Sequence, residues 1–287
     1  MTSRAVPRLS LALAAALFST GGAAIKGCSL NGWQVACLRS AIAALALFVL
    51  LPNARRGYSV AVAGWAAIYA ATLVLFVTAN KLTTSANAIY LQSTAPLWVL
   101  CLSPWLLRER IKRSDALPML LFAIGLVVFF VQKESASRTA PDPASGNVLA
   151  LASGLTFALS LVGLRKVSSG GQDASMALVV LGNVFAAVAC LPKAWPIEGA
   201  GASDWMVLGY LGVFQIGLAY VLVARGLAQV GALEGSLLLM IEPALNPVWT
   251  FFLQGERPGA LALVGGGLIL AATVAKTWID SRRAARS

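Results

Sequence analysis

The chain has no histidine and few acidic residues, and these shortages narrow the chemistry open to it. Of its 287 residues, 11 are Asp or Glu and four are Cys. Metal sites and acid–base catalysis usually need clustered His, Cys or carboxylate side chains. The cysteines lack metal-ligand spacing, and buried small hydrophobic residues are the better interpretation of them. We therefore expect no metal and no cofactor, and we expect that the protein is not an enzyme.

Long apolar runs dominate the sequence instead. The chain is 59% hydrophobic and only 11% charged, which is more apolar surface than a soluble domain could bury. A spanning helix needs about 20 mostly apolar residues, whereas the strands of membrane barrels alternate over shorter stretches. The sequence therefore predicts an all-α polytopic membrane protein. Its ten expected transmembrane helices are residues 8–27, 32–51, 60–80, 85–106, 114–132, 145–164, 174–191, 204–224, 231–253 and 258–278.

The net charge of +11 follows from topology, because the cations gather on one side of the predicted membrane. If the amino terminus is cytoplasmic and the helices alternate, most Lys and Arg residues fall in cytoplasmic segments, as the positive-inside rule requires. We therefore predict a multi-pass protein of the cell inner membrane with both termini cytoplasmic, in contact with lipid and with no nucleic acid partner. Cleavage of the first helix as a signal peptide is the disfavoured alternative, because the nine remaining spans would not keep this excess of Lys and Arg on the cytoplasmic side. The cations left on the outer side are Lys26, Lys81, Lys133, Arg138, Lys193 and Arg257.

One sequence element occurs twice. Pro96 is followed 13 residues later by Glu109, and Pro243 is followed at the same spacing by Glu256. A duplication of half the chain predicts two repeats, residues 1–132 and 145–287, joined by an extracytoplasmic linker at 133–144. Each repeat holds five spans, an odd number, so the second enters the membrane from the opposite side and the repeats are inverted.

These motifs resemble the EamA group of the drug/metabolite transporter superfamily. The resemblance implies ten helices, inverted five-helix repeats, cytoplasmic termini and a central substrate cavity. Among the members of that group, the bacterial amino acid exporters, including the YddG type, are the most similar in pattern. The second repeat has no counterpart of Lys26 or Arg39. The residues that carry the resemblance are Lys26, Arg39, Ala95-Pro96 with Leu107-Arg108-Glu109, and Glu242-Pro243 with Gln254-Gly255-Glu256.

Polar and aromatic side chains recur at three- or four-residue spacing within the predicted spans and so share helix faces. Polar groups within lipid face the bundle interior or a watery cavity. This mixture suits a small zwitterion with an apolar side chain; the alternative is helix packing or anchoring at the membrane interface. The predicted substrate-binding residues are Phe76, Asn80, Asn87, Tyr90, Thr94, Trp98, Thr156, Ser160, Tyr210, Phe214, Glu242 and Asn246.

Glu242 stands out because it is an acid in the middle of a predicted span. It could carry a proton or bind a substrate ammonium group, or it could be a structural partner of Arg39. Arg39 could equally snorkel, pair with an acid, or bind a substrate carboxylate. Pro96 and Pro243 are candidate hinges, with a static kink as the alternative.

The charged residues at span ends have plainer interpretations. We expect Glu109 and Glu256 to form helix-end ion pairs with the arginines beside them, rather than to contact substrate. We expect Lys26 and Lys81 to mark the outer mouth and to anchor at the membrane interface.

The predicted function is secondary transport. The chain has no nucleotide-binding motif, and two inverted repeats suit alternating access around a central cavity. We expect a monomer that exports small metabolites, first of all aromatic or other neutral amino acids. Exporters of lipophilic drugs or cations, or of nucleosides or sugars, are the alternatives within transporters. A channel, a structural subunit or an intramembrane enzyme are the alternatives from other classes. Coupling to protons and facilitated diffusion both stay open.

Overall fold

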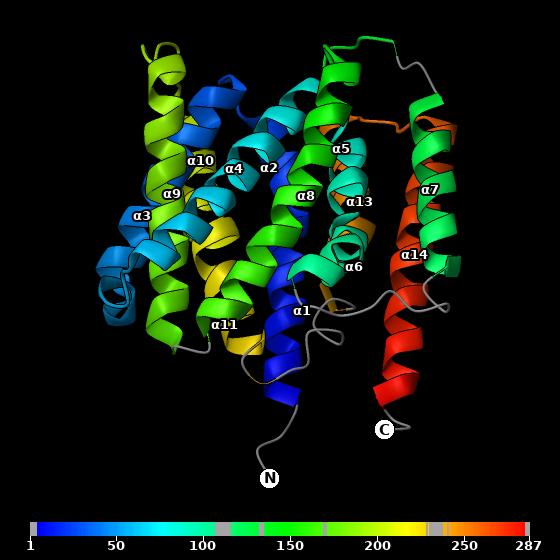
Figure 1. The fold of residues 1–287 in the computed structure, drawn as a ribbon. Coiled ribbons are helices and arrows are strands. Elements are labelled where there is room, and N and C mark those ends of the chain that lie inside the picture. The colour runs from blue at the N-terminus through cyan, green and yellow to red at the C-terminus, as the bar shows by residue number, and fades with distance from the viewer. Residues whose placement is uncertain are drawn as a thin grey trace.

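The structure is a computed structural model that describes residues 5–106, 116–131, 135–168, 171–227, 229, 238–239 and 241–284. The regular elements in these ranges are helices, and no strand occurs there (Figure 1). The bounds of the elements are α1 (Ala5–Ser19), α2 (Gly21–Gly27), α3 (Gly32–Leu50), η1 (Pro52–Arg55), α4 (Val60–Leu82), α5 (Ser85–Gln92), α6 (Ala95–Leu106), α7 (Ala116–Val131), α8 (Pro143–Ser168), α9 (Gln172–Ala194), α10 (Ala202–Tyr210), the π-helix η3 (Leu211–Leu218), α11 (Ala219–Leu227), α13 (Ile241–Gln254) and α14 (Ala260–Ala284).

The helices have the length and surface of membrane spans. Within the described ranges, six helical stretches are long and apolar enough to cross a membrane, and 116–128 and 260–272 are shorter apolar helices. Large apolar side chains cover the outside of the bundle; Met206 and Phe252, for example, are more than two-thirds exposed. The predicted all-α, multi-span fold class is therefore confirmed.

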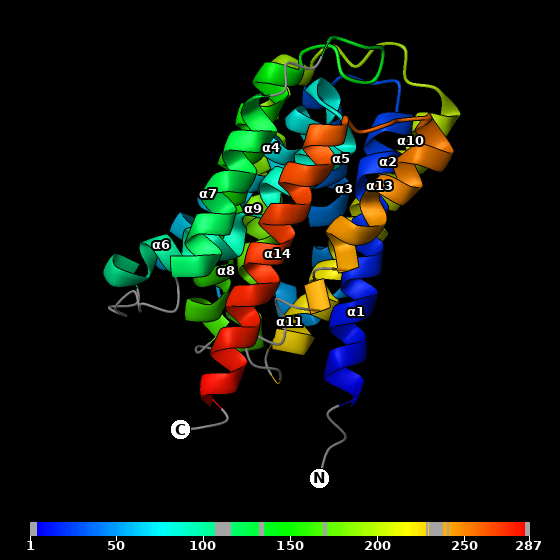
Figure 2. The same ribbon diagram turned by 90° about the vertical axis from the view of Figure 1, so that its right-hand side faces the viewer.

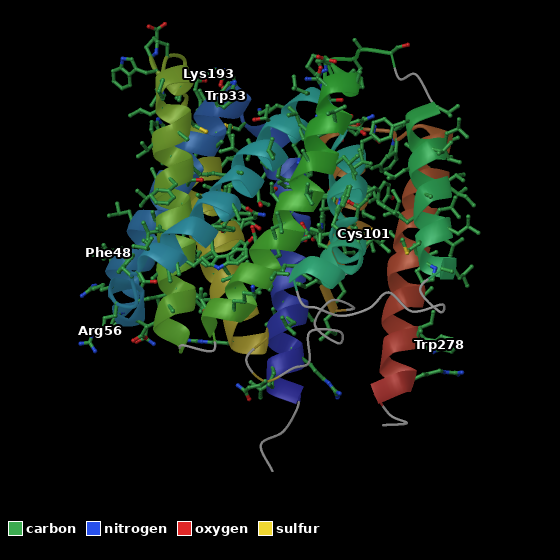
Figure 3. All side chains as sticks on the ribbon, viewed as in Figure 1. Trp33, Phe48, Arg56, Cys101, Lys193 and Trp278 are labelled. Atoms are coloured by element: carbon green, nitrogen blue, oxygen red, sulfur yellow. The ribbon has the colours of Figure 1, made fainter. Side chains whose placement is uncertain are left out.

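Aromatic and cationic side chains meet at both ends of the bundle. The Lys193 ammonium lies 4.5 Å from the centre of the Trp33 ring, and the Arg282 guanidinium lies 3.7 Å from that of Trp278. Trp33 and Trp278 are at opposite ends of the molecule (Figure 3). Such rings are typical of the two membrane–water interfaces.

Local sequence explains where several helices begin. The side chain of Asn31 accepts a hydrogen bond from the Gln34 amide at 3.0 Å, and the Gln34 side chain accepts one from the Asn31 amide at 3.1 Å. This reciprocal capping box begins α3. The hydroxyls of Ser59 and Thr84 cap α4 and α5 by accepting hydrogen bonds from the backbone amides of Val62 and Asn87.

Several predicted spans are not continuous α-helices. The first breaks at Thr20 between α1 and α2, and the fourth breaks at Ser93–Thr94 between α5 and α6. Pro96 lies in the first turn of α6 and Pro243 in the first turn of α13, where a missing N–H costs no intrahelical bond. Their hinge role stays a prediction. The eighth span changes to a π-helix at η3, and Glu109 lies outside the described residues.

Helices from the two halves of the chain interlock. The helix α4 packs on α8 and α9, and α3 also packs on α9. The helix α1 packs on α11 and α13, while α7 lies along α14 at one side of the bundle (Figure 2). The start of α1 and the end of α14 lie at the same end of the bundle (Figures 1 and 2). The opposite end, called the distal end below, holds the α2–α3, α4–α5 and α13–α14 loops and the loop before α8.

Candidate functional site

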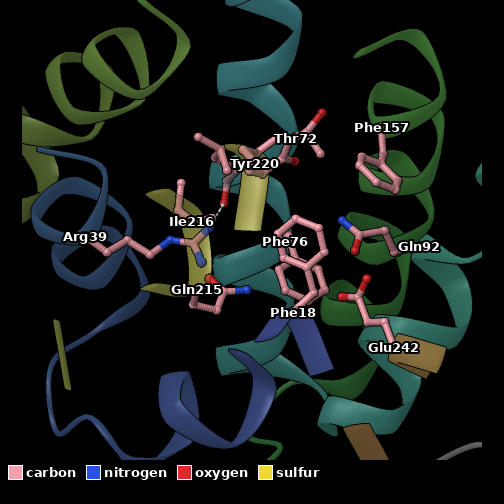
Figure 4. Close-up of a pocket in the computed structure, with 11 residues that line it drawn as sticks. Phe18, Arg39, Thr72, Phe76, Gln92, Phe157, Gln215, Ile216, Tyr220 and Glu242 are labelled. Carbon is pink, nitrogen blue, oxygen red and sulfur yellow. Dashed lines mark hydrogen bonds between the residues drawn. The ribbon is translucent and has the colours of Figure 1, made fainter. Parts of the chain in front are cut away.

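A cavity of about 40 Å³ lies in the interior of the bundle, between helices of both halves of the chain (Figure 4). That volume has room for a few water molecules, whereas ligand sites typically measure about 300–1,000 Å³. A bound metabolite would therefore require the surrounding helices to move apart. The residues that line the cavity are Phe18, Arg39, Thr72, Leu73, Phe76, Gln92, Phe157, Gln215, Ile216, Tyr220 and Glu242.

One side of the cavity carries a buried cation. Arg39 on α3 is 1% exposed, and its Nη2 donates to the backbone oxygen of Leu73 at 3.2 Å. Among the residues that the structure describes, its Nε and Nη1 atoms have no hydrogen-bond partner, and neither does Oε1 of Gln215. Figure 4 shows Gln215 beside Arg39. A desolvated guanidinium with free donors is well suited to bind an anion.

The opposite side of the cavity carries a carboxylate. Glu242 lies in the first turn of α13 and is half-buried. Figure 4 shows its side chain beside Gln92, with the rings of Phe18 and Phe76 between Glu242 and Arg39. The two charged groups form no ion pair with each other, so the structure does not support the predicted structural pairing of Glu242 with Arg39.

Aromatic rings form the wall between the two charged groups. The rings of Phe18 and Tyr220 pack edge to face with their centres 5.2 Å apart, and Tyr69 packs on the other side of Tyr220 at 5.0 Å. These contacts hold Phe18, near the end of α1, against Tyr220 of α11, which in turn packs on Tyr69 of α4. The cavity thus combines an apolar middle with polar ends.

The π-helix η3 brings residues to the cavity that sequence periodicity did not indicate. It supplies Gln215 and Ile216, and Tyr220 follows one turn later. A π-helix changes the register of side chains and occurs frequently at functional sites. A helical wheel for a regular α-helix therefore selected the wrong face of this span. The glycine at 212 was the available signal: a Cβ there would lie 2.8 Å from the backbone oxygen of Arg39.

Two of the predicted substrate-binding residues, Phe76 and Glu242, line the cavity. Thr156 and Ser160 on α8 donate to carbonyls of their own helix. The Ser160 hydroxyl also lies 3.1 Å from that of Thr72, which does line the cavity. Ser160 therefore contacts a residue of the cavity wall without lining the cavity itself.

Three predicted residues lie around the break in the fourth span. The Trp98 indole donates to the Thr94 hydroxyl at 3.0 Å, and Thr94 donates to the Leu91 carbonyl at 2.6 Å. The ring of Tyr90 packs against Gly266 on α14. These residues are not among those that line the cavity, and their contacts stabilise the break between α5 and α6.

Tyr210 and Phe214 lie away from the cavity. The Tyr210 hydroxyl is 2.7 Å from the Thr20 hydroxyl at the break between α1 and α2, and its ring stacks on Phe214. Phe214 is 48% exposed. Both contacts belong to the outer surface of the η3 region.

The predicted asparagines belong to polar contacts outside the cavity. Asn80 donates to the Phe76 carbonyl at 3.1 Å, and Asn87 donates to the Asn147 side chain at 3.2 Å. Asn246 accepts a hydrogen bond from the Ser85 hydroxyl at 2.8 Å. The Asn80 bond lies within α4, whereas the other two connect α5 to α8 and α13.

A buried ion pair closes the distal end. Lys26 Nζ lies 3.1 Å from Glu256 Oε1, and the two side chains are 4% and 0% exposed. The expectation that Lys26 anchors at the interface is therefore wrong, as is the expected pairing of Glu256 with the arginine beside it. The two residues are far apart in sequence, and no local pattern links them. Lys81 likewise turns inward, donating to the Cys28 carbonyl at 2.6 Å.

The described residues provide no obvious metal site. Within those ranges, no group of three or more His, Cys, Asp or Glu side chains is placed to hold a metal ion. Cys28, Cys37 and Cys190 are buried free thiols, and Cys101 is half-buried.

Comparison with known proteins agrees with this architecture. The family model described as "EamA-like transporter family" matches residues 8–131 and again 144–276, and the two-repeat fold of that family is consistent with ten helices. The pseudopaline exporter CntI of Pseudomonas aeruginosa strain UCBPP-PA14 is 26% identical over 274 residues, covering 92% of this chain and 93% of the exporter.

Two further similarities extend the comparison. An uncharacterized transporter of Archaeoglobus fulgidus is 26% identical over 200 residues, which is 70% of each chain. A solved protein crystal structure superposes with a TM-score of 0.66 at 19% identity, covering 98% of this chain and 99% of the other. At that identity the structural likeness supports the fold alone.

Proposed function

The chain belongs to the EamA-like transporter family, and we propose that it exports small metabolites, first of all neutral or aromatic amino acids as YddG-type proteins do. The observation that carries this proposal is the interior cavity, which both halves of the chain line and which has Arg39 and Glu242 at opposite sides of aromatic rings. A carboxylate with an apolar side chain complements the Arg39 side and the aromatic middle of the cavity. The name of the Pseudomonas relative, an exporter, supports the outward direction.

Alternating access is the mechanism that the arrangement favours. The cavity lies between elements of the two halves, so rocking of one half against the other would expose it to each side in turn. Because the cavity measures about 40 Å³ in this structure, the helices around it must separate before a metabolite can enter. The positive-inside pattern of the sequence supports an inner-membrane location in which the chain termini, and the end of the bundle that holds them, face the cytoplasm.

A lipophilic cation is the second candidate substrate, because Glu242 shares its cavity with the rings of Phe18, Phe76 and Phe157. Carboxylates and aromatic faces both attract organic cations. This substrate would leave the Arg39 side of the cavity unused, so the two candidates differ in whether an anionic group is required.

Counterflow in proteoliposomes tests the proposal. The purified protein is reconstituted into vesicles loaded with an unlabelled compound, and uptake of the same labelled compound is followed for a panel of amino acids, nucleosides, sugars and organic cations. We expect trans-stimulated uptake of one or more neutral amino acids, and none in vesicles without protein. Transport of cations alone would replace the first substrate class with the second. Uptake without trans-stimulation would indicate a channel rather than a carrier.

A further inference from the structure

The guanidinium of Arg39 is held in a position that leaves part of its hydrogen-bonding capacity unused. Its side chain is 1% exposed, and within the described part of the chain two of its three nitrogens have no partner. A buried cation without a counter-charge is costly. Protein structures retain such a group where a function requires it, and a transient anionic ligand would supply the missing charge.

The surroundings of Arg39 fix its direction. The third nitrogen, Nη2, donates to the Leu73 carbonyl on α4. The close approach of Gly212 on η3 to the Arg39 backbone, with no space for a Cβ, packs α3 against the π-helix. Because the Leu73 carbonyl restrains the guanidinium and close packing fixes the α3 backbone that carries it, little side-chain entropy is lost when an anion binds.

The charged and polar groups around the cavity divide between its two sides. Gln215 lies beside Arg39, and its amide oxygen has no hydrogen-bond partner among the described residues. Tyr220 also lines the cavity. Glu242 and Gln92 lie on the other side, beyond the phenyl rings. The cavity is therefore positive at one end, apolar in the middle and negative at the other end.

We propose that Arg39 is the carboxylate-binding residue of the transporter, with the Gln215 amide as a second contact. This assignment rests on the proposed function and narrows it to compounds that carry a carboxylate. Among the described residues, Arg39 is the one cation that lines the cavity. A single positive charge suits a carboxylate, which carries one negative charge, and is too little for a dianionic phosphate.

Matched ligands test the assignment on the wild-type protein. L-Phenylalanine carries both charges, L-phenylalanine amide keeps the ammonium group but lacks the carboxylate, and 3-phenylpropionate keeps only the carboxylate. We expect phenylalanine and 3-phenylpropionate to inhibit counterflow at concentrations at least about 10-fold lower than phenylalanine amide, as the loss of a charge-assisted hydrogen bond predicts. Equal inhibition by phenylalanine and its amide would overturn the role of Arg39 without any variant.

Variants localise the effect. We expect Arg39→Gln to raise the KM for phenylalanine about 10-fold or more and to leave inhibition by the amide unchanged, with partial recovery in Arg39→Lys. Arg55→Gln is the control, because Arg55 is exposed and donates to carbonyls at the end of its own helix. If Arg39→Gln weakens both ligands equally, the residue is structural and the assignment fails. If the wild-type protein transports no amino acid, the proposed function fails instead.

A second proposal comes from the distal end and does not depend on the substrate. There, Lys26 Nζ contacts Glu256 and donates to the backbone oxygens of Thr83 and Thr139. The other carboxylate oxygen of Glu256 accepts the Ser85 amide at 2.8 Å. One buried ion pair thus joins α2, the α4–α5 loop, the loop before α8 and the α13–α14 loop.

This ion pair is connected to the cavity through α13. That helix begins next to the cavity with Glu242, and it is hydrogen-bonded to α1, α2 and α5 along its length. Trp249 donates to the Ser19 hydroxyl at 3.0 Å, and Gln254 donates to the Ala23 carbonyl at 3.4 Å. Separating α1 and α2 from α13 would break these bonds together and open the cavity toward the distal end.

We infer that the Lys26–Glu256 pair is the outer gate, which is closed in this structure and separates each time substrate leaves. Buried ion pairs suit such a switch, because water compensates both charges once the two sides separate. Cys28, two residues from Lys26 and 3% exposed, is a natural reporter. The experiment measures its reaction with a membrane-impermeant maleimide in vesicles, after Cys37, Cys101 and Cys190 are replaced by alanine.

We expect the labelling rate of Cys28 to rise about 10-fold in Glu256→Gln, to stay at or below the wild-type rate in Lys26→Met/Glu256→Leu, where apolar groups favour the closed contact, and to stay unchanged in Lys193→Met. Lys193 is an outer-face lysine that packs on Trp33 and takes no part in the pair. The double variant leaves no unpaired charge and so keeps the test valid if the single variant does not fold. Labelling of Cys28 faster than wild type in the double variant, or at the wild-type rate in Glu256→Gln, would overturn the gate.

Discussion

Arg39 and Glu242 lie on opposite sides of one cavity, with the rings of Phe18 and Phe76 between them. The separation prevents the two charges from neutralising each other, so both stay available to a ligand. Had they formed a direct ion pair, the same residues would serve only to hold α3 against α13.

Glu242→Gln tests the carboxylate side of the cavity. The amide keeps the size of the side chain but loses its charge, so we expect the KM for a transported amino acid to rise about 10-fold or more. Counterflow measures this. Glu198→Gln, in an exposed loop, is the matched control, and an unchanged KM in Glu242→Gln would remove Glu242 from the site.

Proton coupling is a separate question for the same residue. We expect facilitated diffusion, so that an imposed pH gradient leaves net efflux from wild-type vesicles unchanged. The measurement is efflux of labelled substrate with and without the gradient. Acceleration that is present in the wild type and absent in Glu242→Gln would instead identify Glu242 as the proton carrier.

The buried ion pair at the distal end predicts a large stability effect. In Glu256→Gln the Lys26 ammonium remains buried without its counter-charge, which we expect to cost about 3–5 kcal/mol. Thermal unfolding in detergent measures the loss. Lys26→Met/Glu256→Leu replaces both charges with apolar groups and should recover most of it, so a double variant as unstable as the single one would contradict this account.

Gly22 predicts a steric effect where α2, α5 and α13 meet. A Cβ there would lie 1.8 Å from the Ser85 hydroxyl and 2.6 Å from Asn246 Nδ2, so Gly22→Ala must displace both side chains. We expect a destabilisation of about 1–3 kcal/mol. Gly64→Ala is the control, because that glycine has nothing within 4 Å of its would-be Cβ; there, alanine should stabilise α4 by about 0.5–1 kcal/mol.

The Thr72–Ser160 contact predicts a small coupling. Their hydroxyls lie 3.1 Å apart between α4 and α8, and hydrogen bonds between membrane helices average about 0.6 kcal/mol in double-mutant cycles. A cycle with Thr72→Val and Ser160→Ala should give a coupling free energy of that size. A coupling above about 2 kcal/mol would mean that the pair belongs to a larger network.

The candidate site was only partly predictable. Phe76 and Glu242 were found because a polar or aromatic side chain in an apolar span faces the interior. Gln215 and Tyr220 were missed because η3 departs from the α-helical period, and Thr94 and Trp98 were placed in the site although they bond to each other at a helix break. Periodicity finds the inward face of a regular helix, but it does not identify a register change.

Composition and hydrophobic run length by themselves determined that this chain is a bundle of membrane helices. A run of about 20 consecutive apolar residues can satisfy its backbone hydrogen bonds within lipid only by forming a helix. Spacing and charge then indicated two inverted repeats. Only the tertiary structure decided which side chains meet: that Glu256 pairs with Lys26, and that Arg39 faces the cavity apart from Glu242. Such contacts depend on helix crossings and on residues distant in sequence, for which a local pattern carries no signal.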